Sequence, residues 1–230
     1  MRRSVLLFLA SPLILLILAC GGGDQEELPA LQAEDVLSRT VAAVAGLQSF
    51  HFRLSHENGT TAMPLNLQLV SAEGDVAIPD RLAADIRAKA GAISASVELI
   101  SVGGRTWITN PFTRGWQRLP GLSVSDVADP AAIVGALAAG LQQVRLAGED
   151  EVGGTTTYHL AGVVDSALLE DALGAAQSGF MVGVDLWVGR DFLPRRARLS
   201  GRLAAGDPDN IVRQLDFSGF NAPVDIRPPR

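Results

Sequence analysis

Few residues in this chain are of a type that could carry out chemistry. Cys20 is the only cysteine, and the three histidines are His51, His56 and His159. No HExxH, G-x-S-x-G or Walker pattern occurs in the sequence, so the common signatures of hydrolases and nucleotide-binding proteins are missing. Three histidines without a nearby cysteine do not resemble a zinc ligand set. We therefore predict a protein that is not an enzyme and uses neither a metal nor a cofactor, with a hydrolase that lacks a recognisable motif as the open alternative.

The single thiol follows an apolar segment at the start of the chain. Two arginines precede a nearly uninterrupted apolar run over residues 5–18, which is the layout of a secretory signal. The run is shorter than the about 20 residues that span a membrane, and Pro12 interrupts it. The residues ILAC at 17–20 are similar to a bacterial lipobox, in which the peptide is cut before the cysteine and the thiol is acylated. Residues 1–19 are thus predicted to be a lipoprotein signal peptide, the alternative being an ordinary signal peptide with an incidental cysteine.

Acylation of Cys20 with chains such as palmitate would hold the mature protein at a membrane. Each buried methylene contributes roughly 0.8 kcal/mol of membrane affinity, and stable anchoring takes more than one chain. Residues 20–32 are rich in glycine and acids that cannot form a core, and we predict that they are a flexible tether. The expected location is the extracytoplasmic face of the cell membrane, with the protein anchored by lipid.

Charge and length limit the class of protein further. The 230-residue chain has a net charge of −6, which becomes −8 once residues 1–19, with two arginines and no acid, are removed. An acidic protein has no electrostatic basis for non-specific binding to nucleic acid. Because a lone cysteine cannot form an internal disulfide, a hydrophobic core must hold residues 33–230, and this length suffices for a single domain.

The spacing of apolar residues predicts a helix followed by many strands. Apolar side chains recur at helical spacing over residues 33–48. From residue 49 onward they alternate with polar side chains, and Asn58-Gly59 predicts the first turn. Short alternating segments joined by glycine-rich turns indicate an antiparallel meander with one apolar face. The predicted strands cover about 49–57, 65–69, 81–90, 92–99, 105–110, 145–152, 155–163, 180–189, 194–203 and 211–220.

The histidines fall on this pattern in different places. His51 lies on the polar side of the first strand and His56 near the turn that follows it, so we expect both to be exposed. His159 falls within a later strand, where we expect a structural role.

Two further helices are predicted within the run of strands. Residues 129–144 begin with Asp129 as the expected N-cap and Pro130 at the first helical position, and they are rich in alanine and glycine. Residues 165–176 form an amphipathic pattern with Asp165 as the expected cap. The fold class is therefore α+β, and a sheet of this many strands tends to curl, with the helices inside the curl. The small side chains of the 129–144 helix leave either close helix–sheet packing or a cavity.

Six segments are distinctive enough to suggest a family, and together they cover nearly all of the mature chain. They are SFHFRL, GDVAIPDR, ELISVGGRTWITNPFTRGWQRLP, GEDEVGGTTTYHLAGVV, VDLWVGRDFLPRRARLSG and NIVRQLDFSGFNAPVDIRPP. In this order they resemble the LppX/LprG (LppX_LprAFG) family of mycobacterial cell-envelope lipoproteins, and the wider fold is similar to the LolA and LolB lipoprotein carriers. The resemblance implies a curved antiparallel half-barrel with helices covering its concave face and an apolar cavity between them.

The resemblance also implies a function for the domain at 33–230. Family members bind acylated lipids or glycolipids in the cavity and carry them through the cell envelope, so an envelope lipid transporter is a candidate partner. A structural or signalling lipoprotein with a filled core is the alternative. Strand alternation and the helical pattern predict these residues as the lining of the lipid cavity: Phe52, Leu67, Ile86, Val97, Leu99, Ile133, Val134, Leu137, Leu141, Val184, Leu186 and Leu215.

The lipobox generates a direct prediction about Cys20. The variant Cys20→Ala should move from the membrane to the soluble fraction or accumulate as an uncut precursor, because it lacks the thiol that is acylated. Membrane fractionation with mass measurement of the N-terminus checks this. A variant that is processed normally and stays on the membrane would show that the lipobox interpretation is wrong.

Overall fold

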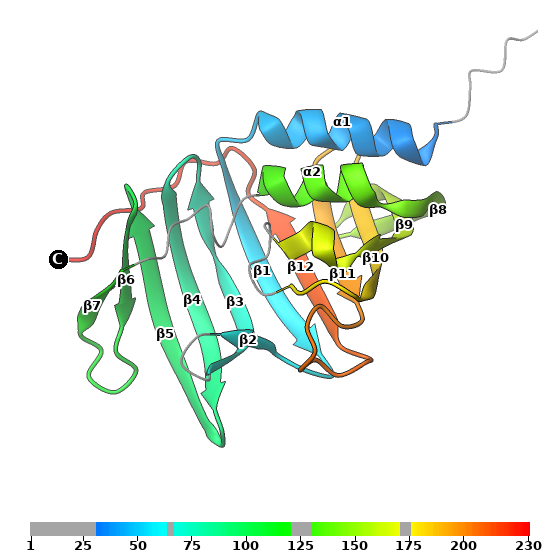
Figure 1. Cartoon of the computed structure of the whole chain (residues 1–230). Helices are drawn as coiled ribbons and strands as arrows, with labels where there is room; N and C mark the ends of the chain where they lie inside the picture. Colours follow the sequence, from blue (N-terminus) through cyan, green and yellow to red (C-terminus); the bar gives the residue numbers. More distant parts are fainter. Residues whose placement is uncertain (1–30, 64–66, 121–129, 171–175) are drawn as a thin grey trace, which may run out of the picture. The chain divides into compact units, whose positions relative to one another are not determined.

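Every strand in the described part of the chain belongs to one antiparallel sheet of twelve strands (Figure 1). The computed structural model describes residues 31–63, 67–120, 130–170 and 176–230. The strands are β1 (Ser49–Glu57), β2 (Thr61–Met63), β3 (Leu67–Ala77), β4 (Arg81–Ala90), β5 (Ile93–Val102), β6 (Arg105–Thr109), β7 (Trp116–Leu119), β8 (Gln142–Val152), β9 (Thr155–Asp165), β10 (Met181–Gly189), β11 (Pro194–Ser200) and β12 (Val212–Ser218).

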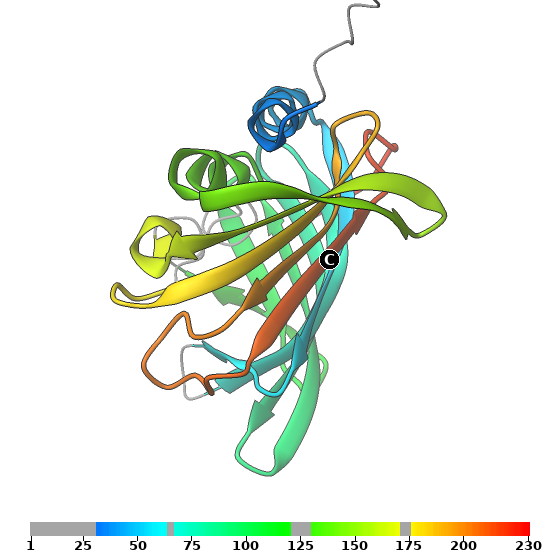
Figure 2. The same ribbon diagram turned by 90° about the vertical axis from the view of Figure 1, so that its right-hand side faces the viewer.

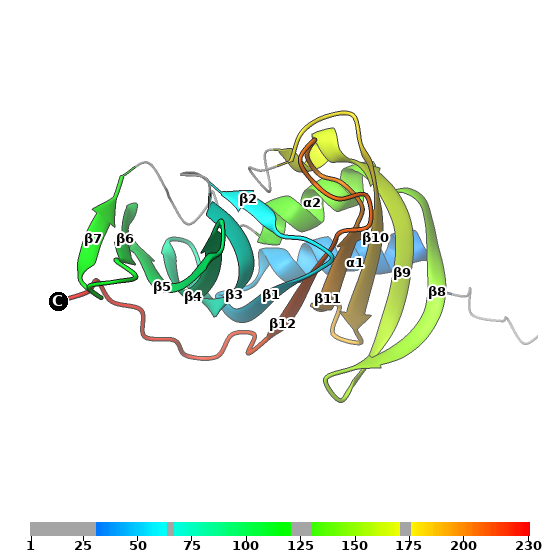
Figure 3. The same ribbon diagram turned by 90° about the horizontal axis from the view of Figure 1, so that it is seen from below.

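The first strand in the sequence occupies the middle of the sheet. The strand order is β7-β6-β5-β4-β3-β1-β12-β11-β10-β9-β8, and β2 pairs with β3 off this path. Strand β1 therefore joins two meanders, one running from β3 to β7 and the other from β12 back to β8 (Figure 3). It pairs with β3 through Phe52 opposite Gly74 and with β12 through Phe52 opposite Phe217.

Two α-helices, α1 (Ala33–Ala45) and α2 (Pro130–Gly140), lie on the same side of the sheet (Figure 2). Helix α1 has acidic residues in its first turn, which favours the helix dipole, and it buries Val36, Leu37 and Val44. Helix α2 contributes the buried Val134 and Leu137. No helix among the described residues is long and apolar enough to cross a membrane.

The predicted helices are present but shorter than expected. Helix α1 ends at Ala45 rather than at residue 48, with Gly46 as its C-cap. Helix α2 ends at Gly140 rather than at residue 144, because Gln142 already pairs with Val163 of β9. The helix expected over 165–176 begins as a 3₁₀ helix over Ser166–Leu169, and Glu170 after it is α-helical. Asp165 does cap it, since its carboxylate accepts a hydrogen bond of 2.9 Å from the Ala167 amide. Asp129 and residues 171–175 lie outside the described residues.

The sheet has two free edges. Its path ends at β7 on one side and β8 on the other, and within the described ranges no pairing joins them. The sheet is open and not strongly curled, so the antiparallel sheet and the helices on one face are confirmed, whereas an enclosed cavity stays a prediction. Residues 31–230 form one compact unit that contains its own core.

Three clusters of buried side chains form this core. The first packs Val44 and Leu47, in and just after α1, against β1, β3, β4 and β5, and it includes Val134 of α2. The second joins Leu137 of α2 to β9, β10 and β11. The third packs Val36 of α1 against Leu160 of β9 and neighbouring strands. Each cluster contains helix residues, so the described core lies where the helices cover the sheet.

This arrangement predicts a large difference between two leucines that face each other. Leu160 is fully buried, whereas Leu146, its partner on the edge strand β8, is 38% exposed. The substitution Leu160→Ala should lower the free energy of unfolding by about 2–5 kcal/mol, since it leaves a cavity in the core. The control Leu146→Ala should cost about 1 kcal/mol or less. Urea denaturation of both variants checks the prediction, and equal losses would contradict the core described above.

Candidate functional site

One face of the sheet, which we call the inner face, carries the apolar side chains and lies under the helices. Residues that pair across antiparallel strands point to the same side. Starting from Phe52, the inner face continues through Gly74 of β3 and Ala84 of β4 to Leu99 of β5. In the other direction it continues through Phe217 of β12.

The same reasoning extends the inner face to the far meander. Leu215, two residues before Phe217, lies opposite Ala197 of β11, and Ala197 lies opposite Leu186 of β10. Leu186 in turn lies opposite the buried Leu160 of β9. The inner face is therefore continuous from β5 to β9.

All strand residues that the sequence predicts as a lining lie on the inner face. Ile86 pairs with Val97, and Leu67 lies two residues before Leu69, which pairs with Ala88. The full set placed by register is Phe52, Leu67, Ile86, Val97, Leu99, Val184, Leu186 and Leu215. Their shared face follows from the register, while their contact with a lipid stays a prediction.

The helix residues in the predicted lining have different surroundings. Val134 is buried in the first cluster and Leu137 in the second. Leu141 packs against the second and third clusters. Leu141 can approach the sheet closely because Gly162 of β9 has no side chain; a Cβ there would lie 2.9 Å from the Leu141 Cγ. The side chain of Ile133 lies outside the described residues.

The helices cover the inner face unevenly. Val184, Leu186 and Leu99 are buried, whereas other members of the same face are only half-buried. The half-buried residues lie farther along the strands from the helices and include Phe52, Leu54, Leu67, Leu69, Val97 and Leu215. The inner face thus has a closed part beneath the helices and a partly open apolar part beyond them.

A cluster of polar side chains, which the sequence did not reveal, lies at one end of the apolar inner face. His56 follows Phe52 and Leu54 on the same side of β1, and its Nδ1 lies 2.9 Å from the Val70 carbonyl oxygen. Since a carbonyl only accepts, Nδ1 carries the proton and donates it. His56 Nε2 then accepts from the Thr61 hydroxyl, at 2.8 Å. The expectation that His56 is exposed is therefore wrong, because its side chain is used inside the fold.

Arg213 of β12 lies opposite His56 and completes this group. Its Nε donates to the Thr61 hydroxyl at 2.9 Å, and its Nη2 donates to Asp207 at 2.7 Å. Both side chains of the Arg213–Asp207 pair are only 6% exposed. The alternation Arg213, Leu215, Phe217 could have revealed this arginine from the sequence, since it places Arg213 on the apolar side of β12.

Burial controls the protonation of His56. Loss of solvent lowers the pKa of His56 below its ordinary value, and the charge of Arg213 acts in the same direction. The hydrogen bond to Val70 and the charge of Asp207 oppose this shift without overcoming it. His56 is therefore favoured as the neutral ring, which donates from Nδ1 and accepts at Nε2.

The opposite, outer face carries a ladder of charged and aromatic side chains. Arg53 pairs with Glu73, and its hydrogen bonds lower the pKa of that carboxyl. Farther along, Arg196 bonds Asp216, and Trp187 stacks on His159 with 4.4 Å between ring centres. His51, between Glu73 and Asp75, is half-buried in this ladder rather than exposed.

His159 contacts two carboxylates in the same ladder. Its Nε2 lies 2.8 Å from Asp185 and its Nδ1 3.2 Å from Asp150, while Asp150 also accepts the Trp187 indole N–H at 2.8 Å. These contacts tie β8, β9 and β10 together, which supports a structural role for His159. In the described ranges, no group of three or more His, Cys, Asp or Glu side chains is arranged to hold a metal ion.

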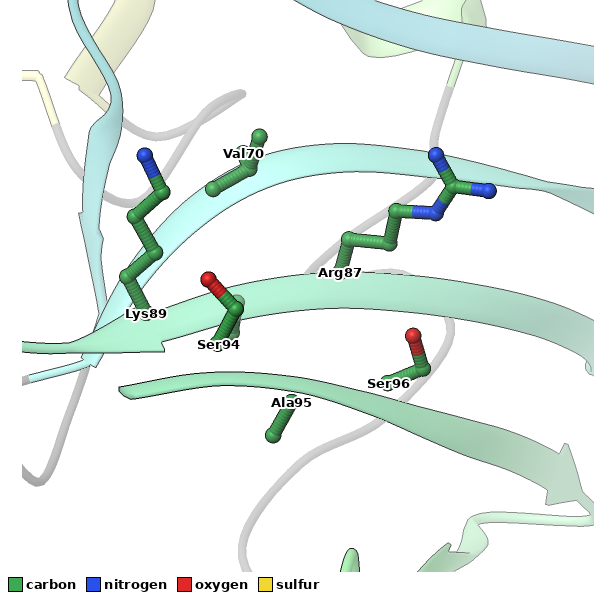
Figure 4. Close-up of a pocket in the computed structure, with 7 residues that line it drawn as sticks. Val70, Arg87, Lys89, Ser94, Ala95 and Ser96 are labelled. Carbon is green, nitrogen blue, oxygen red and sulfur yellow. The ribbon is translucent and has the colours of Figure 1, made fainter. Parts of the chain in front are cut away.

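Two shallow pockets lie on the outer face. One of about 160 Å³ is lined by Arg87, Lys89, Ser94 and Ser96, which point to one side of the β4–β5 hairpin, while Ala95 points to the other (Figure 4). The second, of about 260 Å³, lies over β8, β9 and β10 near Asp185.

Comparison with known proteins identifies a family and similar solved structures. The LppX_LprAFG lipoprotein family matches residues 32–226. The crystal structure of LprF from Mycobacterium bovis superposes with a TM-score of 0.65 and 19% identity, covering 86% of this chain and 96% of that chain. LppX from Mycobacterium tuberculosis gives a TM-score of 0.61 and 19% identity, covering 85% and 98%.

The remaining comparisons add less. A LolA superfamily protein from Nitrosomonas europaea has a TM-score of 0.28, with 17% identity over 87% of this chain and 96% of that chain, which supports no argument about fold. Among curated protein sequences, none matches this chain. At 19% identity, the two mycobacterial structures establish the shared fold alone.

The lowered pKa of His56 predicts a pH dependence of stability. Below about pH 6.5 the unfolded chain takes up a proton on His56 that the folded chain resists, so the free energy of unfolding should fall as the pH falls through this value. Above it, the ring is neutral in both states and contributes no pH dependence. Replacing His56 by Gln should flatten the decline between about pH 7.5 and about pH 5.5.

Urea denaturation at these two pH values measures the effect. His51→Gln is the matched control, since it removes a histidine from the outer face of the same strand, and it should keep the decline that His56 causes. An unchanged decline in His56→Gln would contradict the assignment.

Proposed function

Because this chain belongs to the LppX_LprAFG lipoprotein family, we propose that it binds acylated lipids or glycolipids on its inner face and carries them within the cell envelope. The observation that carries the proposal is the partly open apolar surface beyond the helices. Half-buried Phe52, Leu54, Val97 and Leu215 share this surface. Apolar area left against water lowers the stability of a protein unless something covers it, and an acyl chain is a suitable cover.

Binding would follow from removal of acyl chains from water. Each Å² of apolar area that is buried contributes about 25 cal/mol. In this proposal the domain at 33–230 forms a curved half-barrel around an apolar cavity, with α2 over one side of it. The cavity is lined by the residues predicted from the sequence, including Ile133. Opening of the sheet relative to the helices would let the chains leave.

The same proposal places the protein at a membrane. Residues 1–19 are the signal peptide, Cys20 carries the acyl anchor on the extracytoplasmic face, and residues 20–32 are the tether. Membership in a lipoprotein family supports this arrangement. The anchored domain would receive its cargo from one envelope component and deliver it to another, such as an envelope lipid transporter. It would act without bond-making chemistry.

One observation favours a different role. Leu141 lies close against Gly162, and the cluster around Leu137 consists of buried side chains, so the described part of the inner face under α2 is covered. If the rest of the face closes in the same way, the protein is a structural or signalling lipoprotein with a filled core. The two proposals differ in whether the purified protein contains lipid.

Substitution of Val97 distinguishes the lipid carrier from the lipoprotein with a filled core. Val97 lies on the partly open apolar surface, so Val97→Trp should fill space that an acyl chain uses. We expect organic extraction of the purified wild type to yield acylated lipid, and Val97→Trp to contain much less while unfolding at nearly the wild-type temperature. A filled core would instead lose about 1–3 kcal/mol from the added bulk.

Ser96→Trp is the matched control, since Ser96 is exposed on the outer face of the same strand. It should retain both the lipid and the stability. A wild type without lipid, together with marked destabilisation of the Val97 variant alone, would support the filled core.

A further inference from the structure

We propose that Arg213 binds the head of the lipid, by donating a hydrogen bond from its Nη1 to an uncharged ester carbonyl where the acyl chain begins. This inference rests on the proposed lipid binding and names the chemical class that the site prefers. It concerns a single atom of the guanidinium group, because the other polar contacts of Arg213 are already made.

Within the described residues, the hydrogen bonds of Arg213 leave one of its three nitrogen atoms without a partner. Nε is bonded to Thr61 and Nη2 to Asp207, whereas Nη1 is buried and has no hydrogen-bond partner in the part of the chain that the structure describes. Leaving a buried donor unpaired costs about 1–3 kcal/mol. Native proteins seldom retain such a group without a ligand, water or other partner for it.

The position of Arg213 suits the junction between an acyl chain and its head. Along β12, the side chains of Phe217, Leu215 and Arg213 follow one another on the inner face. Along β1, His56 follows Phe52 and Leu54 in the same way. Four residues of strand span about 13 Å, which is enough for most of an acyl chain to lie against the apolar rows with its ester at the polar end.

The charges around Arg213 favour a neutral acceptor. Asp207 already balances the charge of the guanidinium, and its carboxylate is held by the Leu203 and Ala204 amides. His56 is bonded as a neutral ring and adds no positive charge. A buried anion here would lack a counter-charge, and removing it from water would cost free energy that nothing offsets. An ester carbonyl needs only the hydrogen bond.

A pair of probes that differ by one carbonyl tests the inference. Monopalmitoylglycerol carries the ester, and its hexadecyl ether has an equally long chain without the carbonyl. The protein used is residues 31–230, which form one compact unit with its own core. The wild type should bind the ester about tenfold more tightly than the ether, as expected for a hydrogen bond to a charged donor. Arg213→Met should bind both probes like the ether.

Two further variants show whether a loss of preference comes from the missing Nη1 donor or from a destabilised fold. Arg213→Met leaves Asp207 buried without its partner, so Arg213→Met/Asp207→Asn removes both charges together and should show the same loss of preference. Arg198→Met is the control on the outer face, because Arg198 pairs with Glu57 there and should leave the preference unchanged. The infrared band of the bound ester carbonyl gives a readout in the wild type alone, and it should shift as a hydrogen-bonded carbonyl does.

The outcomes distinguish the two levels of the proposal. If the wild type binds neither probe, lipid binding itself is wrong and this inference falls with it. If it binds ester and ether equally, or the carbonyl band is that of a free ester, lipid binding stands and the role of Arg213 is overturned. Preferred binding of monopalmitoylglycerol phosphate that Arg213→Met abolishes would overturn the uncharged acceptor.

Discussion

The two helices are too small to cover the apolar face of the sheet, and most features of the molecule follow from that shortage. At about 1.5 Å per residue and about 10 Å in width, α1 and α2 together cover roughly 360 Å². The strands, spaced about 4.8 Å apart, span roughly 1,500 Å². The described helices therefore cover about a quarter of one face. A globular domain of this size normally closes its apolar surface within one chain.

The side chains divide the inner face according to this coverage. Beneath the helices are branched side chains such as Val36, Leu137 and Leu160, which form dense clusters. On β3 and β4 the inner face also carries the small residues Ala72, Gly74 and Ala84, and Ala72 and Ala84 are buried in the first cluster. At the far end Arg213 and His56 replace apolar side chains. An inner face that runs from buried apolar residues through half-buried ones to a polar end has the polarity of an amphiphile with an apolar tail.

Much of this could be predicted from the sequence, because strand alternation is a local signal. The positions that share the inner face followed from alternation alone, and register confirmed that they do share it. Helix ends were less predictable: residues 142–144 look helical, yet Gln142 pairs with β9, a partner distant in sequence. The helix expected after Asp165 starts as a 3₁₀ turn, and the Ser166 hydroxyl there bonds to Gln177 and Phe180, which no local pattern predicts.

The polar group at His56 shows a different limit of sequence reasoning. His56 is near a turn, which favours exposure on average, but its neighbours on β2 and β12 are 5 and 157 residues away in the chain. Only the strand order brings Thr61, Asp207 and Arg213 together. Likewise, which apolar residues stay half-buried depends on how far the helices reach, and no local pattern contains that information.

The charged ladder on the outer face fixes the register of the strands, and this allows the inner face to stay partly open. Each exposed ion pair contributes little by itself, about 0–1 kcal/mol. Their value lies in register, because a slip by one residue would turn Arg53 and Glu73 inward and expose Phe52 and Leu54 on the other side. Such a slip would bury unpaired charges, so the alternative pairings are strongly disfavoured. A sheet held in register from its polar face can leave part of its apolar face half-buried, and that part is the area on which we propose that a lipid binds.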